Sequence, residues 1–445
     1  MNMPSDDAKK RQERNLTLFG VLAVLFVFVG MAQSWNVSLA ILNLCLISAI
    51  MTLGVNIQWG YAGIVNFGVM GFAALGGLAG VVVSMPPVIA GWQAGGIELL
   101  LGGLIILITI VLAVFIASHT QHLGRWRFWL IAGVSLCGYF LLRMLVDPAI
   151  EAIESINPAK AGHIGGLGLP ILVSWGVGGI FAAGAAYVIG KASLGLRSDY
   201  LAIATLGISE IVVYVLKNED WLARGVKNVN GLPRPVPYEV DLQTQPWLID
   251  MAATLGTDIA ELSSIIVKLC YAGLFIIVLA VLFWLFEIAL RSPWGRMMRA
   301  IRDNEVAANA MGKDVKAKHL QVFVLGSAVI GVAGAMLTTL DGQFTPASYL
   351  PLRFTFLIWI MVIVGGSGNN FGSVLGGFVI WFFWVESEPL GLWLMDVITL
   401  PLDAGNPLRI HLLESAAHMR LMTMGLLMLL MLRFAPQGLI PEIKR

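Results

Sequence analysis

Long apolar runs recur along this chain from residue 16 to residue 434, and they constrain its fold more than any other feature. A helix that spans a bilayer needs about 20 consecutive and mostly apolar residues, and several of these runs reach that length. Only 12% of all residues are charged, against about 25% in a typical soluble domain. We therefore predict an all-α, polytopic integral membrane protein with about 10–12 transmembrane helices.

The apolar runs define twelve candidate spans, with each limit good to about 2–4 residues. The run 371–386 is short and begins with glycines, so a re-entrant segment is the alternative there. The first run follows the basic segment KKRQER (9–14), but it is long and has only a weak cleavage site, so we predict an uncleaved anchor. The candidate spans are 16–34, 37–57, 61–83, 97–117, 127–147, 167–190, 199–217, 265–290, 320–340, 352–369, 371–386 and 418–434.

The distribution of charge between loops orients these spans. The loop 291–319 holds seven Lys and Arg residues against three acids, whereas the loop 218–264 holds three against seven. Basic residues concentrate on the cytoplasmic side of membrane proteins, so we place 291–319 inside and 218–264 outside. Twelve spans then put both termini inside, together with the short basic loops 118–126 and 191–198.

The stretch GYAGIVNFGVMGFAALGGLAG (60–80) contains seven glycines, no charge and one amide, Asn66. Small residues let helix backbones approach closely in lipid. Because the glycines fall on both sides of a helix, they indicate either a helix packed on all sides or a helix broken part-way, as in many transporters. An amide at membrane depth needs a hydrogen-bonding partner or water, so Asn66 is a candidate residue of a transport path.

A second stretch, GGSGNNFG (365–372), is similar to residues 60–68, because both contain a glycine-rich turn followed by Asn-Phe-Gly. Paired glycine-interrupted segments in two halves of a chain are typical of transporter binding regions. Chance similarity is the alternative in a chain with 49 glycines. We predict that the path is lined by polar groups and their neighbours in the glycine-rich or interior spans, although hydrogen bonding to adjacent helices would also explain them. These residues are Asn66, Phe67, Gly68, Thr205, Ser209 and Glu210.

The basic loop 291–319 contains two predicted short helices. Ser292-Pro293 is typical of a helix start, and Asp303 is predicted to cap a second helix that ends at Gly312. That second helix would present an apolar side to a partner protein, formed by Val306, Ala307, Ala310 and Met311. The alternative is a helix that lies on lipid headgroups, which the basic residues favour.

Five blocks of the chain resemble, in this order, the M-type permeases of branched-chain amino acid ABC importers, and they frame about two-thirds of it. They are LGVNIQWGYAGIVNFGVMGFAALGG (53–77), LRSDYLAIATLGISEIV (196–212), RMMRAIRDNEVAANAMGKDVKAKHLQVFVLGSAVIGVAGAM (296–336), VGGSGNNFGSVLGG (364–377) and FAPQGLIPE (434–442). The chain departs from the family pattern between residues 80 and 196, where two apparent extra spans lie within 97–165. It also departs near Ile64–Asn66, where the family is usually more polar or has smaller residues.

This resemblance implies an importer permease of a bacterial cytoplasmic (inner) membrane. It implies four kinds of partner: a second, H-type permease, two cytoplasmic ATP-binding subunits, an extracytoplasmic solute-binding protein and a branched-chain or similar amino acid as cargo. The second helix of the loop would then be the coupling helix that docks on an ATPase, through Asp303, Glu305, Val306, Ala308, Met311 and Gly312. The altered segment near Asn66 leaves urea, short amides and other small amino acids as alternative cargoes.

The resulting organisation is a cytoplasmic tail (1–15), a transmembrane permease domain (16–434) and a second cytoplasmic tail (435–445). Within the permease domain we distinguish the insertion 97–165, the extracytoplasmic loop 218–264 and the coupling loop 291–319. The loop 218–264 is the longest outside segment, and its GLPRPVP is stiffened by three prolines, so we predict that it meets the binding protein.

Nothing in the sequence points to catalysis, a cofactor, a metal site or nucleic-acid binding. Cys45, Cys137 and Cys270 are scattered, and His119 and His122 have no third ligand nearby. No Walker A motif is present, so ATP hydrolysis would require separate subunits. An ion-coupled transporter is the competing class, but only Glu210 lies near the middle of a span. A passive channel would need a repeated polar lining, which the sequence lacks.

Overall fold

The computed structural model describes residues 6–120, 124–156, 162–403 and 405–442, and helices account for nearly all of its regular structure. Within these ranges, ten helices are long and apolar enough to cross a membrane. Two further predicted spans appear as shorter apolar helices, α3 (Val69–Ser84) and α15 (Pro351–Gly365). The predicted class, an all-α polytopic membrane protein, is therefore confirmed.

The helices follow the predicted runs and usually extend beyond them. Nine of the long helices are α1 (Asp6–Ala32), α2 (Trp35–Ala62), α4 (Ile89–His119), α5 (Arg125–Ser155), α6 (Ile171–Ser193), α7 (Ser198–Asn218), α11 (Ile259–Arg291), α14 (Val315–Asp341) and α16 (Asn370–Thr399). The tenth candidate consists of α17 (Pro407–Glu414), η4 (Ser415–His418) and α18 (Met419–Phe434).

Short elements fill the loops at the two ends of the bundle. They are α8 (Asp220–Ala223), η2 (Gly225–Lys227), β1 (Val229–Asn230), α9 (Glu239–Gln243), α10 (Pro246–Leu255), α12 (Pro293–Asp303), α13 (Glu305–Ala310), β2 (Gln343–Phe344) and η3 (Pro346–Ser348). The strands β1 and β2 pair in antiparallel fashion, with Val229 opposite Phe344.

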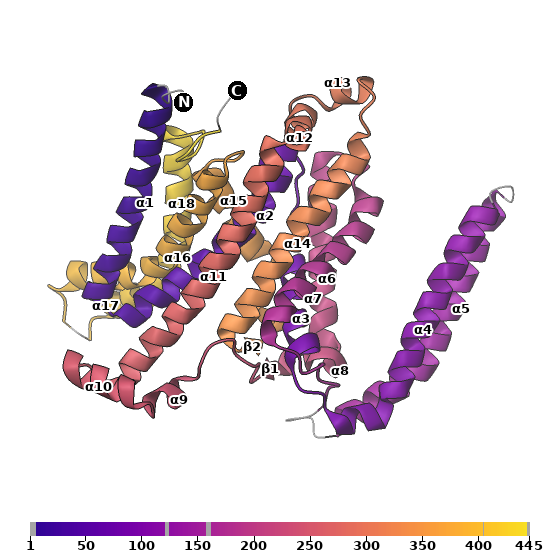
Figure 1. Ribbon diagram of the computed structural model, residues 1–445, viewed down its shortest axis with the longest axis horizontal. Helices are drawn as coiled ribbons and strands as arrows, with labels where there is room; N and C mark the ends of the chain where they lie inside the picture. The colour runs from indigo at the N-terminus through magenta and orange to yellow at the C-terminus, as the bar shows by residue number, and fades with distance from the viewer. Residues whose placement is uncertain (1–5, 121–123, 157–161, 404, 443–445) are drawn as a thin grey trace.

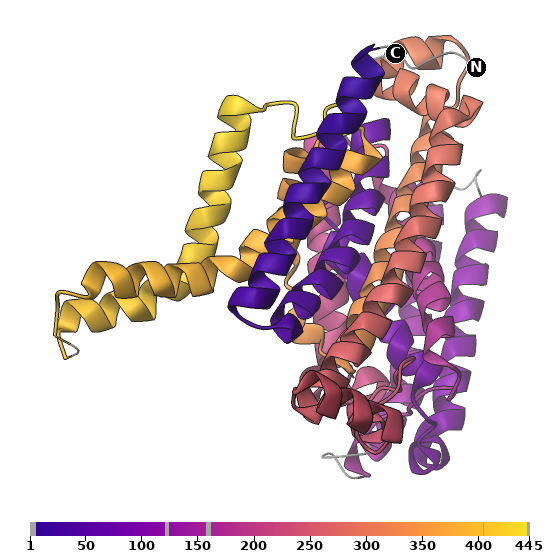
Figure 2. The same ribbon diagram turned by 60° about the vertical axis from the view of Figure 1, so that its left-hand side comes forward.

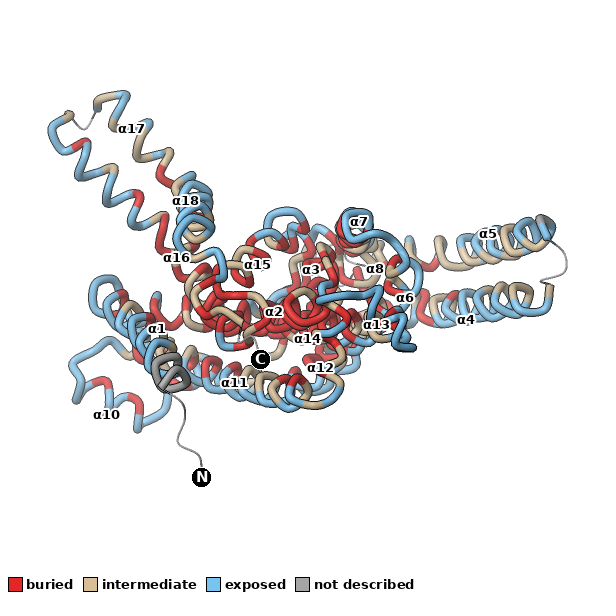
Figure 3. The backbone as a smooth tube through the Cα atoms, turned by 90° about the horizontal axis from the view of Figure 1, so that it is seen from above, coloured by how far each residue is buried: buried red, intermediate tan, exposed pale blue. Residues whose placement is uncertain are grey.

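The buried core lies where α2, α3, α6 and α14 pack together, as the red segments at the centre of Figure 3 show. Glycine is required at this contact. A Cβ atom added to Gly76 of α3 would lie 1.9 Å from the carbonyl oxygen of Gly331 in α14. One added to Gly334 would lie 2.0 Å from the carbonyl oxygen of Ala73. These positions confirm the interpretation of the glycines as close-packing residues.

The glycine-rich stretch 60–80 is also broken part-way. Helix α2 ends at Ala62, residues 63–68 are not helical, and α3 begins at Val69. Gly63 ends α2 with a φ of +71°, which an L side chain rarely adopts. The second stretch contains a similar break between α15 and α16, where Gly366 and Gly368 have φ values of +115° and +79°. The two similar sequences therefore both interrupt helices.

The spans predicted at 371–386 and within the insertion form longer helices in the structure. Helix α16 is continuous for 30 residues and includes Pro389, and the re-entrant alternative for 371–386 stays a prediction. Its later part leaves the bundle and runs alongside α17 (Figure 2). The insertion forms a long hairpin of α4 and α5, which stands apart from the bundle (Figure 1) and exposes apolar side chains all round.

The loops group at two opposite ends of the molecule, as the charge distribution predicts. Helices α12 and α13 lie at the same end as both chain termini and the far end of the α4–α5 hairpin (Figure 1). Helices α9 and α10 and the β1–β2 pair lie at the other end. We call these the coupling-loop end and the β1–β2 end. Their assignment to the inside and outside of a cell remains a prediction.

Candidate functional site

The break between α2 and α3 meets helix α7 through two hydroxyl groups. The backbone N–H of Phe67 donates to Oγ1 of Thr205 at 3.0 Å, and that of Gly71 donates to Oγ of Ser209 at 2.7 Å. The first N–H groups of any helix lack partners within the helix, so Ser209 supplies an acceptor that α3 needs, while Thr205 supplies one to the break just before it. The structure thus brings together candidate path residues that are far apart in the sequence.

Asn66 is completely buried at this break, and both polar atoms of its amide are hydrogen-bonded. Its Oδ1 accepts from the N–H of Gly68 at 2.8 Å, and its Nδ2 donates to Oε1 of Gln58 at 2.9 Å. Gln58 in turn donates to Oγ of Ser327 in α14 at 3.1 Å. Hydrogen bonding to neighbouring segments, the alternative considered from the sequence, is therefore what this conformation displays.

Glu210 follows Ser209 in α7 but does not join these contacts. It is half-exposed, and within the described ranges its carboxylate makes no hydrogen bond or ion pair. The predicted place of Glu210 at the path therefore has no contact in this structure to support it, and it stays a prediction. A lone carboxylate on an outer helix also gives little support to an ion site.

Only a small cavity separates α7 from α3. Its volume is about 10 Å³, and Gly68, Gly71, Thr205 and Ser209 are among the residues that enclose it. Such a volume holds roughly one water molecule. The structure is therefore closed at the candidate path, and passage of a solute would require α7 to move away from α3.

A cluster of aromatic side chains on the other side of the break was not predicted from the sequence. The indole N–H of Trp359 in α15 donates to the carbonyl oxygen of Asn66 at 3.0 Å. The ring of Trp359 lies 4.8 Å from that of Trp59 and 5.0 Å from that of Phe67. Phe356 lies 5.2 Å from Phe67 and is 44% exposed. No spacing rule links α2 to α15, so only their packing reveals this apolar wall.

The coupling loop forms two helices, as predicted, but with a different cap. Ser292 caps α12 by accepting from the N–H of Trp294 at 3.2 Å. Asp303 was predicted to cap the second helix, and this is wrong: Asn304 caps α13 by accepting from the N–H of Ala307 at 2.9 Å. Asp303 ends α12 instead. The predicted end is confirmed, since Gly312 has a φ of +76°.

The side chains of α13 face in two directions. Val306 of α13 and Met311, which follows the helix, are 80% and 79% exposed. Glu305 is also exposed, so these three side chains are free to contact another protein. Ala308 was predicted to lie at the docking surface, but it is only 8% exposed and packs against its own chain. A direct contact between Ala308 and a partner is therefore contradicted.

Arg302 of α12 joins the coupling loop to the end of α2. Its Nη1 donates to the carbonyl oxygen of Gly60, and its Nη2 donates to Oε1 of Glu442 at 3.1 Å. Burial by itself lowers the pKa of Arg302, but Glu442 and then Asp303 stabilise the charged form and together raise that pKa. The guanidinium therefore stays charged beside the helix break. The sequence analysis missed Arg302 and Glu442, which lie 140 residues apart.

The C-terminal segment reaches Arg302 because it docks on the break between α15 and α16. The N–H groups of Leu439 and Ile440 donate to the carbonyl oxygens of Val364 and Gly365 at 2.8 and 2.9 Å. The break between α15 and α16 also contacts α2 directly: the N–H of Gly368 donates to Oδ1 of Asn56 in α2 at 2.9 Å. A motion of α12 would therefore act on both interrupted helices.

Metal ligation finds no support among the described residues, which contain no group of three His, Cys, Asp or Glu side chains able to hold an ion. His119 is exposed and stacks on Phe115, and His122 lies outside the described ranges. Cys45 is buried, whereas Cys137 and Cys270 are exposed on the apolar surface.

Comparison with known families finds a match over residues 131–432 to the model described as branched-chain amino acid transport system / permease component. This range contains three of the five blocks noted above and excludes 53–77 and 434–442. No solved structure matches the chain.

Several curated proteins are similar to the chain. The high-affinity branched-chain amino acid transport system permease protein LivM of Escherichia coli is 26% identical over 65% of this chain and 61% of its own length. A probable LivM of Methanocaldococcus jannaschii is 27% identical over 88% of this chain and 90% of its own length. The xylose transport system permease protein XylH of Escherichia coli is 25% identical over 73% of this chain and 70% of its own length. The chain thus spans less than two-thirds of the bacterial LivM proteins.

Proposed function

Because this chain belongs to the family of branched-chain amino acid transport permease components, we propose that it is a permease subunit of an ABC importer for branched-chain or similar amino acids. The names of the LivM relatives support the cargo class. The observation that carries the mechanism is the link from the coupling loop, through Arg302, to the end of α2 beside the helix break. A permease driven by a separate ATPase needs a connection of this kind.

The proposed complex contains a second, H-type permease, two cytoplasmic ATP-binding subunits and an extracytoplasmic solute-binding protein. The coupling-loop end would face the cytoplasm of a bacterium, in keeping with its basic residues. Val306 and Met311 would contact an ATPase, with Glu305 beside them, since these side chains are exposed and have no covering segment. Ala308, Asp303 and Gly312 would act indirectly, by packing or shaping the loop that carries this contact.

The path would open between α3 and α7. Movement of α7 would withdraw the hydroxyls of Thr205 and Ser209 and free the N–H groups of Phe67 and Gly71. Free N–H groups at a helix N-terminus attract a carboxylate, which every amino acid carries. Phe67 and its partly exposed neighbour Phe356 offer an apolar wall that suits an aliphatic side chain.

A sugar is the second candidate cargo, and the similarity to the xylose permease XylH supports it. A sugar has no carboxylate for the freed N–H groups, so it would rely on hydroxyl contacts instead. Urea, short amides and other small amino acids also remain candidates, because they are small and polar and the contacts at Asn66 are not specific to leucine.

The test is uptake by proteoliposomes that contain the chain together with its proposed partner subunits. We expect ATP-dependent entry of labelled leucine, competed by isoleucine and valine but not by xylose. A catalytically inactive ATPase subunit is the control. Uptake that persists with that subunit and stops with an ionophore would indicate an ion-coupled transporter. Competition by xylose, urea or amides, with no effect of isoleucine or valine, would overturn the proposed cargo.

A further inference from the structure

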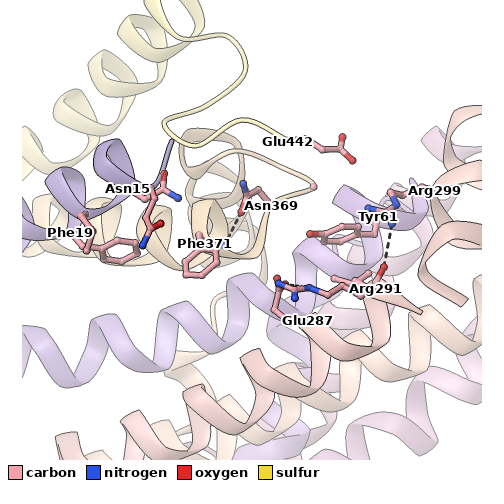
Figure 4. Close-up of a pocket in the computed structure, with 13 residues that line it drawn as sticks. Asn15, Phe19, Tyr61, Glu287, Arg291, Arg299, Asn369, Phe371 and Glu442 are labelled. Carbon is pink, nitrogen blue, oxygen red and sulfur yellow. Dashed lines mark hydrogen bonds and ion pairs between the residues drawn. The ribbon is translucent and has the colours of Figure 1, made fainter. Parts of the chain in front are cut away.

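A second cavity lies at the coupling-loop end, apart from the contact between α3 and α7. Its volume is about 550 Å³, within the range typical of small-molecule sites. Helices α1 and α12 and the last turns of α2 and α11 bound it on several sides. The break before α16 and the C-terminal segment complete its lining. Figure 4 shows that α1 forms one side and that the charged residues come from the other elements.

One charged group of this cavity is not neutralised. Glu287 pairs with Arg291 at 3.1 Å, and Glu442 pairs with Arg302 at 3.0 Å. Arg299 of α12 donates to the carbonyl oxygen of Leu290 at 3.2 Å, and no described carboxylate lies within ion-pair distance of it. Its remaining N–H groups are thus available to one anionic group, and a phosphate suits the planar guanidinium well.

The opposite side of the cavity is apolar and continues into the surface that faces lipid. Leu16 and Phe19 of α1 line the cavity together with Phe371 of α16. Leu16 itself is 66% exposed, and Val27 follows on the same side of α1 with 42% of its surface exposed. A ligand with hydrocarbon chains therefore finds exposed apolar side chains of α1 beside the cavity that holds the guanidinium.

From this arrangement we propose that the cavity binds a glycerophospholipid of the adjacent leaflet, with its phosphodiester on Arg299 and its acyl chains along Leu16 and Phe19. Lipid headgroups carry anionic charge at this depth, and basic pockets between helices bind them. Glu287 and Glu442 also line the site, so they disfavour a ligand with a second phosphate. The site therefore prefers phosphatidylglycerol or phosphatidylethanolamine to cardiolipin. This proposal does not depend on the cargo of the permease.

The test is native mass spectrometry of the full chain in detergent, titrated separately with these three lipids. We expect Arg299→Gln to weaken phosphatidylglycerol binding about tenfold, the usual effect of losing a charge-assisted hydrogen bond. Arg296→Gln is the matched control, because Arg296 is exposed on the same helix and does not line the cavity. Equal loss in both variants, or tighter binding of cardiolipin, would overturn the proposal.

A second arm separates a lipid from a soluble phosphate compound. Inorganic phosphate and glycerophosphoglycerol share the phosphate chemistry but lack acyl chains, so we expect them to bind at least a hundredfold more weakly. Comparable binding would mean that the cavity takes a soluble phosphate, contrary to the proposal. If Arg299→Gln does not fold, Arg299→Lys is the second variant: it keeps the charge but loses the planar fork that matches a phosphate, so we expect phosphatidylglycerol to bind about three- to tenfold more weakly. Unchanged binding in a folded Arg299→Lys would overturn the assignment of the phosphodiester to the guanidinium of Arg299.

Discussion

Replacement of Arg302 by glutamine should separate the coupling loop from the interrupted helices. Glutamine keeps a hydrogen-bond donor but removes the positive charge of the guanidinium, which now donates hydrogen bonds both to Glu442 and to the carbonyl oxygen of Gly60. Hydrogen bonds to charged groups contribute about 1.5–3 kcal/mol each. The side chains of Arg302 and Glu442 are each 23% exposed, so solvent screens part of this energy. We therefore expect Arg302→Gln to destabilise this contact by about 2–4 kcal/mol.

The first assay for this variant is unfolding in mixtures of detergent and SDS, arranged as a double-mutant cycle with Glu442→Gln. We expect an interaction energy of about 1–2 kcal/mol between the two positions. Hydrogen exchange of residues 434–442 should accelerate in either variant, because their docking relies on the same pair. In the assembled transporter, ATP hydrolysis should continue while uptake falls.

Additive single effects, within about 0.5 kcal/mol, would refute the direct pairing. Undiminished uptake in a variant whose C-terminal segment has come loose would refute the transmission role. Arg296→Gln serves as the control for loss of a basic residue from α12, since Arg296 is exposed and joins none of these contacts.

Three further predictions concern packing, the α3–α7 contact and docking. Gly76→Val should destabilise the fold by about 3 kcal/mol or prevent insertion, because α14 leaves no room for a Cβ atom at this position. Gly103→Val is the control, since a Cβ atom at Gly103 would have no neighbouring atom within 4 Å, and it should leave the midpoint of SDS unfolding unchanged. Ser209→Ala should strand a buried N–H of α3, cost about 1–3 kcal/mol in the same titration and slow uptake. Uptake and stability at the wild-type level would contradict that role. Val306→Glu should reduce ATPase co-purification at least tenfold through a desolvated charge, and Lys316→Ala should change it less than twofold. The reverse ranking would indicate that α13 lies on lipid.

Local features of the sequence were sufficient to predict the class of fold and several helix ends. Most apolar runs of about 20 residues form a helix of their own, because a backbone in lipid must satisfy its hydrogen bonds internally. Ser292 begins α12 and Gly312 follows α13 as expected, since capping and positive φ depend on the residue itself. Asp303 and Asn304 are both good caps, so the sequence leaves the choice between them open, and the structure uses Asn304.

The contacts of the candidate site depend on tertiary structure. Thr205 was recognisable as a polar group in a span, but its bond to Phe67 depends on how α7 packs against the break. The face of α13 that Ala308 occupies is covered by the chain itself, which periodicity alone does not reveal. The pairing of Arg302 with Glu442 likewise requires the C-terminal segment to fold back. A helix is encoded by residues three or four apart, whereas contacts between helices depend on which surfaces meet when the whole bundle packs.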